Sequence, residues 1–251
     1  ARNMLLFGMP LMVDSFNALV TSRGDNMLVA RFWGEEALAF YSFAWNLPMM
    51  IAALANTIDG MLYPVFARFN DDLAELRRWF NLTNKMWAAM GFPLGIALAL
   101  YAPYIVELVY GPNWGPSVPI LRVMAVQFAL RFSTGYSYGH LVLVRGRTRY
   151  MMKWGLVNTV LLFTAGLWMI RSLGPIGGAW FWVLQFVVLF PLVRFPLILQ
   201  ELGTLEYLRH IWQPIIAGLV AAGCALLTMQ LGSDTALLFA SLVAFCLAYL
   251  V

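Results

Sequence analysis

The chain has 251 residues, of which 62% are hydrophobic and 11% charged, and its formal net charge is +4. Soluble domains contain about 45–50% apolar and about 25% charged residues, so this composition excludes an ordinary water-soluble domain. Only helices and closed barrels satisfy their backbone groups in lipid, and barrel strands alternate in polarity over about 10 residues. The apolar runs here are long and continuous, so the sequence predicts an all-α polytopic membrane protein.

A bilayer-spanning helix needs about 20 mostly apolar residues. Segments that meet this requirement predict about eight transmembrane helices, over residues 4–32, 36–66, 80–109, 117–143, 149–171, 176–199, 208–231 and 234–251. The last segment ends with the chain, as a truncated helix would. We expect residues 1–200 to form a six-helix transmembrane lobe and residues 201–251 to add two further helices.

Two short motifs refine the third predicted helix. "NDDLAELRRWFNLTNK" (70–85) begins with acidic residues and continues with basic ones, which is typical of an N-capped helix aligned with its dipole. "GFPLG" (91–95) combines a proline with two small residues four positions apart, and it predicts a close helix contact, with a hinge as the alternative.

The distribution of Lys and Arg predicts the orientation, because cytoplasmic connections of membrane proteins are enriched in both. With a cytoplasmic amino end, only Arg31 and Arg171 lie near outside connections. Eleven fall inside: Arg2, Arg68, Arg77, Arg78, Lys85, Arg145, Arg147, Arg149, Lys153, Arg194 and Arg209. We therefore expect a multi-pass protein of the bacterial inner (plasma) membrane whose first residue in this segment is cytoplasmic.

Three predicted helices carry polar stripes at helical spacing. The first has Asp14, Asn17, Thr21 and Asp25; the second has Asn56, Asp59 and Tyr63; the fourth has Gln127, Arg131, Thr134 and Tyr138. A charge at a helix centre costs at least about 2.5–3.5 kcal/mol, so each needs water or a partner. These stripes predict a wet cavity lined by the early helices.

An alternative reading of the stripes is that they are buried pairs that fix helix register, such as Asp25 with Arg131. Arg23 lies about 200° around the helix from Asp25, so the two do not pair within one helix. If Asp25 faces the cavity, Arg23 contacts another helix or extends its side chain outward to the interface. Asp59 lies close enough to the predicted cytoplasmic end to reach interfacial water.

Four stretches in order carry a family resemblance: "DNMLVARFWG", "EALAFYSFAWNLPMM", "MLYPVFARFNDD" and "LVYGPNWGPSVPILRVMAVQFALR". Together they resemble the polysaccharide, or lipid-linked oligosaccharide, flippases of the multidrug/oligosaccharidyl-lipid/polysaccharide exporter superfamily. The resemblance covers about residues 1–200, with a mild departure at Leu38-Ala39-Phe40-Tyr41. Members have about twelve or fourteen helices in two six-helix lobes around a central cavity. This chain resembles the second lobe plus two helices, which implies that an N-terminal lobe of the same protein is its partner.

The resemblance implies transport of a lipid-diphosphate-linked glycan by alternating access, with membrane lipids around the protein and with no cofactor, metal or nucleic acid. It implies anion contacts for Arg23 and Arg131 and hydrogen bonds to sugar hydroxyls for Gln127, Asn17 and Tyr138. It assigns Asp14, Asp25 and Asp59 to proton or sodium coupling. Guanidinium forks suit phosphate oxygens, and a desolvated carboxylate titrates more readily near neutral pH.

Other functions remain open at this point. An ion-coupled antiporter of cationic drugs belongs to the same superfamily, but its cavity would not need Arg131. A membrane glycan polymerase or ligase is an enzyme of similar composition, and the short predicted outside connections disfavour it. The sequence has no nucleophile motif, metal-ligand cluster or glycine-rich phosphate loop. A purely structural membrane subunit is disfavoured by the polar stripes.

Overall fold

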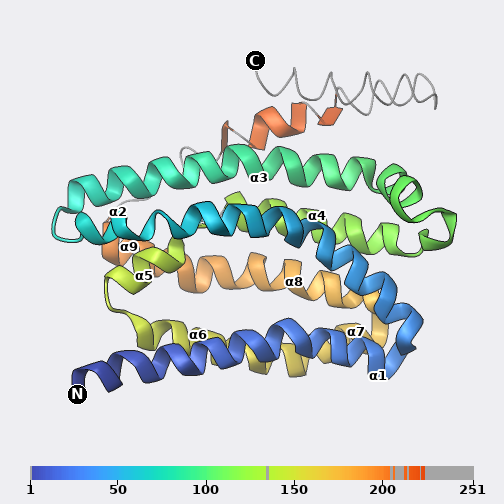
Figure 1. Cartoon of the computed structure of the whole chain (residues 1–251), viewed down its shortest axis with the longest axis horizontal. Coiled ribbons are helices and arrows are strands. Elements are labelled where there is room, and N and C mark those ends of the chain that lie inside the picture. Colours follow the sequence, from blue (N-terminus) through green and yellow to red (C-terminus); the bar gives the residue numbers. More distant parts are fainter. Residues whose placement is uncertain are drawn as a thin grey trace.

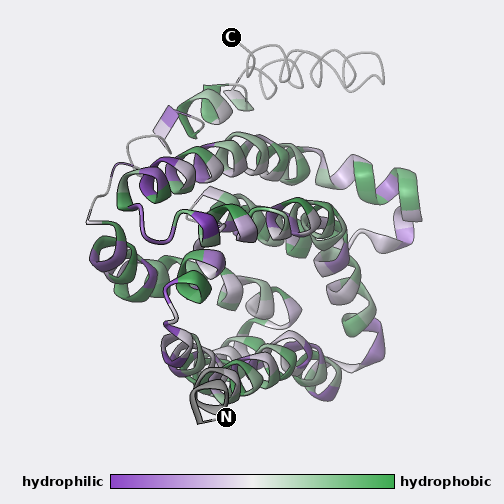
Figure 2. Ribbon diagram, turned by 60° about the vertical axis from the view of Figure 1, so that its left-hand side comes forward, coloured by the Kyte–Doolittle hydropathy of each residue, from purple (hydrophilic) through white to green (hydrophobic). Residues whose placement is uncertain are grey.

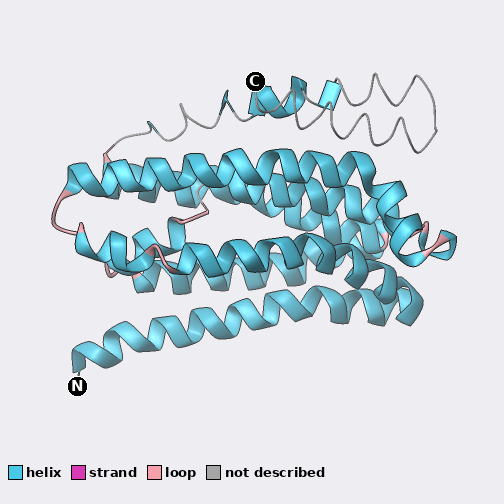
Figure 3. Ribbon diagram, turned by 45° about the horizontal axis from the view of Figure 1, so that its top comes forward, coloured by secondary structure: helices cyan, strands magenta, loops and turns pink. Residues whose placement is uncertain are grey.

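The computed structural model describes residues 2–133, 136–203, 206, 212–213, 215–220 and 222–223. All regular elements among these residues are helices, and no strand occurs in this part of the chain (Figure 3). The long helices lie roughly along one common axis (Figure 1). The structure thus confirms the predicted all-α class.

Helix α1 (Arg2–Gly60) contains the first predicted span, 4–32, and most of the second, 36–66, and these two parts meet at Gly34. Gly34 has φ 84° and ψ 179°, a conformation that glycine adopts without the penalty a Cβ would bring. The chain turns back at this residue, so residues 2–33 and 35–60 run as two separate limbs (Figure 1). We call them the first and second limbs of α1. The second limb ends at Gly60 and is followed by the short helix α2 (Tyr63–Arg68).

Helix α3 (Leu73–Tyr110) begins where the capping motif predicts, because the Asp72 carboxylate accepts hydrogen bonds from the backbone N–H groups of Ala74 and Glu75. After Gly111 and the short 3-10 helix η1 (Pro112–Trp114), helix α4 (Ser117–Ser133) packs along α3. A Cβ on Gly91 would lie 2.1 Å from the Cβ of Phe132, and one on Gly95 would lie 2.6 Å from the Cβ of Ala129. The small pair in "GFPLG" is therefore a packing contact, as expected.

The fourth predicted span, 117–143, is not one helix. Helix α4 ends at Ser133, residues 136–137 form a turn, and helix α5 (Tyr138–Val144) follows. Thr134 of the predicted polar stripe lies outside the described residues. In the turn, the Ser137 hydroxyl donates to Oδ1 of Asp59 across 2.6 Å. The break thus supplies a donor to a buried carboxylate, which a continuous helix pattern does not predict.

The fifth and sixth predicted spans are each one continuous helical segment with a wider turn inside. Helix α6 (Thr148–Leu161) continues through the π-helical turn η2 (Leu162–Gly166) into α7 (Leu167–Leu173). After Gly174, helix α8 (Pro175–Leu189) continues through the π-helical turn η3 (Phe190–Arg194) into α9 (Phe195–Leu202). Pro191 lies in η3, and because proline has no N–H to donate, it favours a local change in the hydrogen-bond pattern.

Three layers follow from the contacts between these helices. The first limb of α1 packs against α6 at one edge, α8 lies in the middle against α4, and α3 covers α4 at the other edge (Figure 1). Hydrophobic residues cover most of the helix surfaces, and hydrophilic ones gather toward the helix ends and turns (Figure 2). Exposed apolar side chains on this scale are typical of a surface that meets lipid rather than water.

Four helical segments of the described chain are long and apolar enough to cross a membrane: Gly8–Arg68, Leu73–Tyr110, Thr148–Leu173 and Pro175–Leu202. The first of these folds back at Gly34, so it supplies two passes. These segments support the predicted polytopic membrane protein. Of the seventh predicted span, 208–231, only residues 212–213, 215–220 and 222–223 are described, and they are helical; the eighth, 234–251, lies outside the described residues.

Candidate functional site

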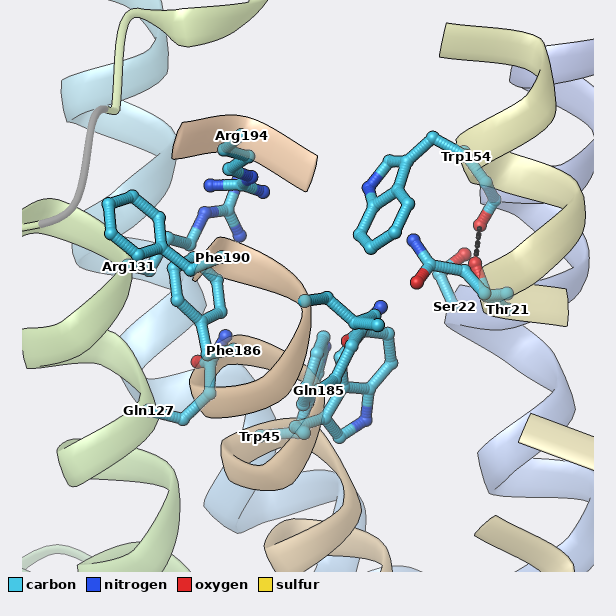
Figure 4. A pocket seen from close by; sticks show the side chains of 14 residues that line it. Thr21, Ser22, Trp45, Gln127, Arg131, Trp154, Gln185, Phe186, Phe190 and Arg194 are labelled. Atoms are coloured by element: carbon cyan, nitrogen blue, oxygen red, sulfur yellow. Dashed lines mark hydrogen bonds between the residues drawn. The ribbon is translucent and has the colours of Figure 1, made fainter. Parts of the chain in front are cut away.

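A cavity of about 400 Å³ lies among both limbs of α1 and the helices α4, α6, α8 and η3. Such a volume is within the range of small-molecule sites, about 300–1,000 Å³. Its lining is formed by Ala18, Thr21, Ser22, Trp45, Gln127, Arg131, Trp154, Asn158, Trp182, Gln185, Phe186, Leu189, Phe190 and Arg194. Figure 4 shows Arg131 and Arg194 on one side, Trp154 on the opposite side, and Trp45 and Gln185 between them.

Two arginines make one side of this cavity cationic. Arg131 is half-buried; its guanidinium lies 3.9 Å from the sulfur of Met49 and 5.6 Å from the ring centroid of Tyr136. Among the described residues, Arg131 forms no ion pair with a carboxylate. The Arg194 guanidinium lies over Phe186 and Tyr138, 4.7 and 5.5 Å from their ring centroids.

A second hollow of about 230 Å³ adjoins the first, since Arg131, Trp154 and Arg194 line both. Asp14, Tyr136 and Tyr138 also line it. Tyr138 and Asp14, two of the predicted site residues, are thus brought to the same arginines as the larger cavity.

Two amide side chains of the cavity lining, Gln127 and Asn158, each have an oxygen without an internal partner in the described part of the chain. The Oε1 atom of Gln127 and the Oδ1 atom of Asn158 are buried and accept no hydrogen bond from the described residues. Gln127 as a whole is only 3% exposed. A buried amide oxygen without a partner is costly, so these two atoms are weak points in the packing around the cavity.

Asp25 lies behind the cavity wall rather than in its lining. It is 1% exposed, and its Oδ2 accepts hydrogen bonds from the Tyr41 hydroxyl at 2.8 Å and from the Trp182 indole N–H at 2.9 Å. Asp25 therefore joins the two limbs of α1 to α8, and the pair with Arg131 that the sequence allowed is not formed. Arg23 is exposed and lines neither hollow, in keeping with its direction away from Asp25.

The rest of the first polar stripe packs against α6. The Thr159 hydroxyl donates to Oδ1 of Asn17 across 3.0 Å, and Asn17 is buried. Gly155 permits this approach, because a Cβ there would lie 2.8 Å from Oδ1 of Asp14. Thr21 reaches the cavity itself.

Asp59 belongs to a separate cluster where the second limb, α3 and α5 meet. Its carboxylate accepts from the Trp87 indole N–H at 3.0 Å and from Ser137 at 2.6 Å, and it lies 2.9 Å from Nε2 of His140. The exposed fraction of Asp59 is 7%, so little water reaches this carboxylate. Asp59 lines neither of the two hollows.

Several lining residues were not identified from the sequence. The sequence pattern assigns Arg194 to the cytoplasmic charges, and it identifies the tryptophans only as apolar residues. A signal was present in the sixth predicted span, where positions 182, 185, 186 and 189 recur at helical spacing. Without knowledge of the neighbouring helices, that stripe does not distinguish a cavity wall from a lipid-facing surface.

The fold and the cavity define a helical multi-pass membrane protein with cationic and aromatic groups facing one internal space. Residues 1–119 match a family described as "Polysaccharide biosynthesis protein". The chain is 29% identical over 211 residues to the teichuronic acid biosynthesis protein TuaB of Bacillus subtilis, covering 81% of this chain and 43% of that protein. It is 27% identical over 218 residues to the lipopolysaccharide biosynthesis protein WzxC of Escherichia coli, covering 86% and 44%.

A third relative is the amylovoran biosynthesis protein AmsL of Erwinia amylovora, 25% identical over 158 residues, or 62% of this chain and 40% of that protein. No solved structure matches the chain. The chain spans less than half the length of these relatives. The matches show that the chain is similar to polysaccharide biosynthesis proteins, in agreement with the resemblance in its motifs.

Proposed function

We propose that this chain is one lobe of an exporter that moves a lipid-linked oligosaccharide across the bacterial plasma membrane by alternating access. The observation that carries the proposal is that Arg131 and Arg194, on different helices, face one cavity inside the helical bundle. Similarity to a teichuronic acid biosynthesis protein and a lipopolysaccharide biosynthesis protein supports the substrate class.

The charge of the cavity favours an anionic ligand. Two arginines line it, and Asp14 is the only carboxylate that lines either hollow among the described residues. Guanidinium groups bind phosphate oxygens through paired hydrogen bonds, so a lipid diphosphate suits the arginine side. A cavity for cationic drugs would require an excess of carboxylates, so the antiporter alternative has less support.

The remaining assignments follow from this proposal. The N-terminal lobe of the same protein would close the cavity from the other side, and the lipid tail would remain outside against membrane lipids. Gln127, Tyr138 and Asn17 would bind sugar hydroxyls, while Asp14, Asp25 and Asp59 would be the sites of ion coupling. Arg23, exposed on the first limb, would meet an anionic group outside this chain's own cavity. The first residue of the segment would be cytoplasmic.

The test is the Arg131→Ala substitution in the full-length protein, in a strain that lacks the native copy. We expect loss of surface polysaccharide at a normal protein level in the membrane, because the half-buried guanidinium is the group that meets the diphosphate. Arg149→Ala, at an exposed arginine outside both hollows, is the matched control and should export normally. Normal polysaccharide with Arg131→Ala would remove this residue from the mechanism.

A further inference from the structure

Aromatic rings and amides line the cavity beside and opposite the arginines (Figure 4). The rings of Trp45 and Trp182 lie against each other, with centroids 5.0 Å apart and planes at 43°. Trp154 lies across the cavity from the arginines (Figure 4). The lining also includes two amides, Gln127 on α4, one helical turn from Arg131, and Asn158 on α6.

The position of Trp182 is fixed from behind. Its indole N–H donates to the buried Asp25 carboxylate, which is held in turn by Tyr41. This bond satisfies the polar atom of the ring, so the indole needs no hydrogen-bond partner in the cavity. Tryptophans that anchor a protein at the membrane surface leave this N–H for water and headgroups, which is a different arrangement.

An aromatic face with nearby amides matches the surface of a sugar. The C–H groups of a sugar ring form an apolar face that can pack on the negative face of an aromatic ring, and its hydroxyls form hydrogen bonds with amide groups. A cation could also lie over these rings, but Arg131 and Arg194 across the same cavity oppose it.

We propose that Trp45, Trp182, Gln127 and Asn158 form a carbohydrate subsite that packs against the sugar unit next to the diphosphate, with Asp25 as the positioning residue for Trp182. This inference rests on the proposed function. It adds a place for the sugar, on the aromatic lining next to the arginines that would bind the anionic group.

The test uses the full-length protein in a strain that lacks the native copy, with surface polysaccharide and lipid-linked glycan measured in the same cells. Trp45→Leu and Trp182→Leu keep apolar bulk but remove the aromatic face, whereas Trp45→Phe keeps that face. Trp168→Leu is the matched control, because Trp168 is 69% exposed and lies outside the cavity. We expect the leucine variants to reduce export about two- to tenfold, the effect of losing one stacking contact. Trp45→Phe should export more than Trp45→Leu, and Trp168→Leu should export normally.

Gln127→Leu and Asn158→Leu provide a second measurement if a tryptophan variant fails to accumulate. The side-chain oxygens of Gln127 and Asn158 accept no hydrogen bond from the described residues. Replacing them with leucine therefore breaks no such bond, so we expect the protein to fold while export falls. Normal export by the leucine variants at normal protein levels would overturn the subsite, as would equal losses in Trp45→Phe and Trp45→Leu. Normal polysaccharide in the strain without any copy would instead overturn the proposed function. The subsite would also be overturned if Trp45→Leu abolished binding of the cation tetraphenylphosphonium and left export unchanged.

Discussion

Removing the Asp25 carboxylate tests how much the contact between the α1 limbs and α8 contributes to stability. In Asp25→Ala, the Tyr41 hydroxyl and the Trp182 indole N–H both lose their acceptor. Tyr41 is fully buried, so its hydroxyl has no access to water. An orphaned buried polar group costs about 1–3 kcal/mol, and interhelical hydrogen bonds in membranes average about 0.6 kcal/mol with a maximum near 1.7.

The two bonds together therefore give an expected loss of about 1–3 kcal/mol, less than the roughly 2–6 kcal/mol that two orphaned groups would cost in a soluble protein. For a chain of this size, each kcal/mol lowers the melting temperature by about 2–4 °C, so we expect a decrease of about 2–12 °C. The assay is thermal unfolding of the purified protein in detergent, followed by size-exclusion chromatography.

Two further variants separate the bonds. Tyr41→Phe removes one donor and leaves the carboxylate bonded to Trp182, so its melting temperature should fall by less than that of Asp25→Ala. Asp25→Asn keeps an oxygen acceptor and should also retain more stability. A melting temperature of Asp25→Ala equal to that of the unmodified protein would refute the reasoning, because it would mean that these hydrogen bonds contribute nothing net.

Two other predictions concern packing and access. Gly91→Leu should destabilise the protein by more than about 1 kcal/mol, because a Cβ at position 91 would lie 2.1 Å from the Cβ of Phe132. Gly139→Ala should be nearly neutral, because a Cβ there would meet nothing within 4 Å. Thermal unfolding measures both variants, and equal melting temperatures would contradict the close contact at Gly91. The second prediction uses a protein without its two native cysteines. In that background, Gln185→Cys should react with a water-soluble thiol reagent, because Gln185 lines the cavity, and Asp25→Cys should be protected, because Asp25 is 1% exposed. The reverse order of labelling would show that the cavity is dry or lies elsewhere.

The sequence alone determined the class of protein and most of the helices. Long apolar runs leave no other way to satisfy backbone groups in lipid, and local signals set the helix ends: the Asp72 cap begins α3, and Gly34 marks the reversal between the first two spans. The polar stripes correctly indicated that Gln127 and Arg131 are not lipid-facing, because helical spacing places them on one face.

Only the tertiary structure decided which polar residues share a space. Asp25 and Arg131 both lie on predicted polar faces, yet the first bonds to Tyr41 and Trp182 while the second faces the cavity. The polar stripe of one helix predicts which face of that helix avoids lipid, but it does not predict which other helix packs against that face. Arg194 and Trp182 enter the site from a distant helix whose sequence reads as apolar, because the arrangement of helices depends on packing between segments far apart in the chain.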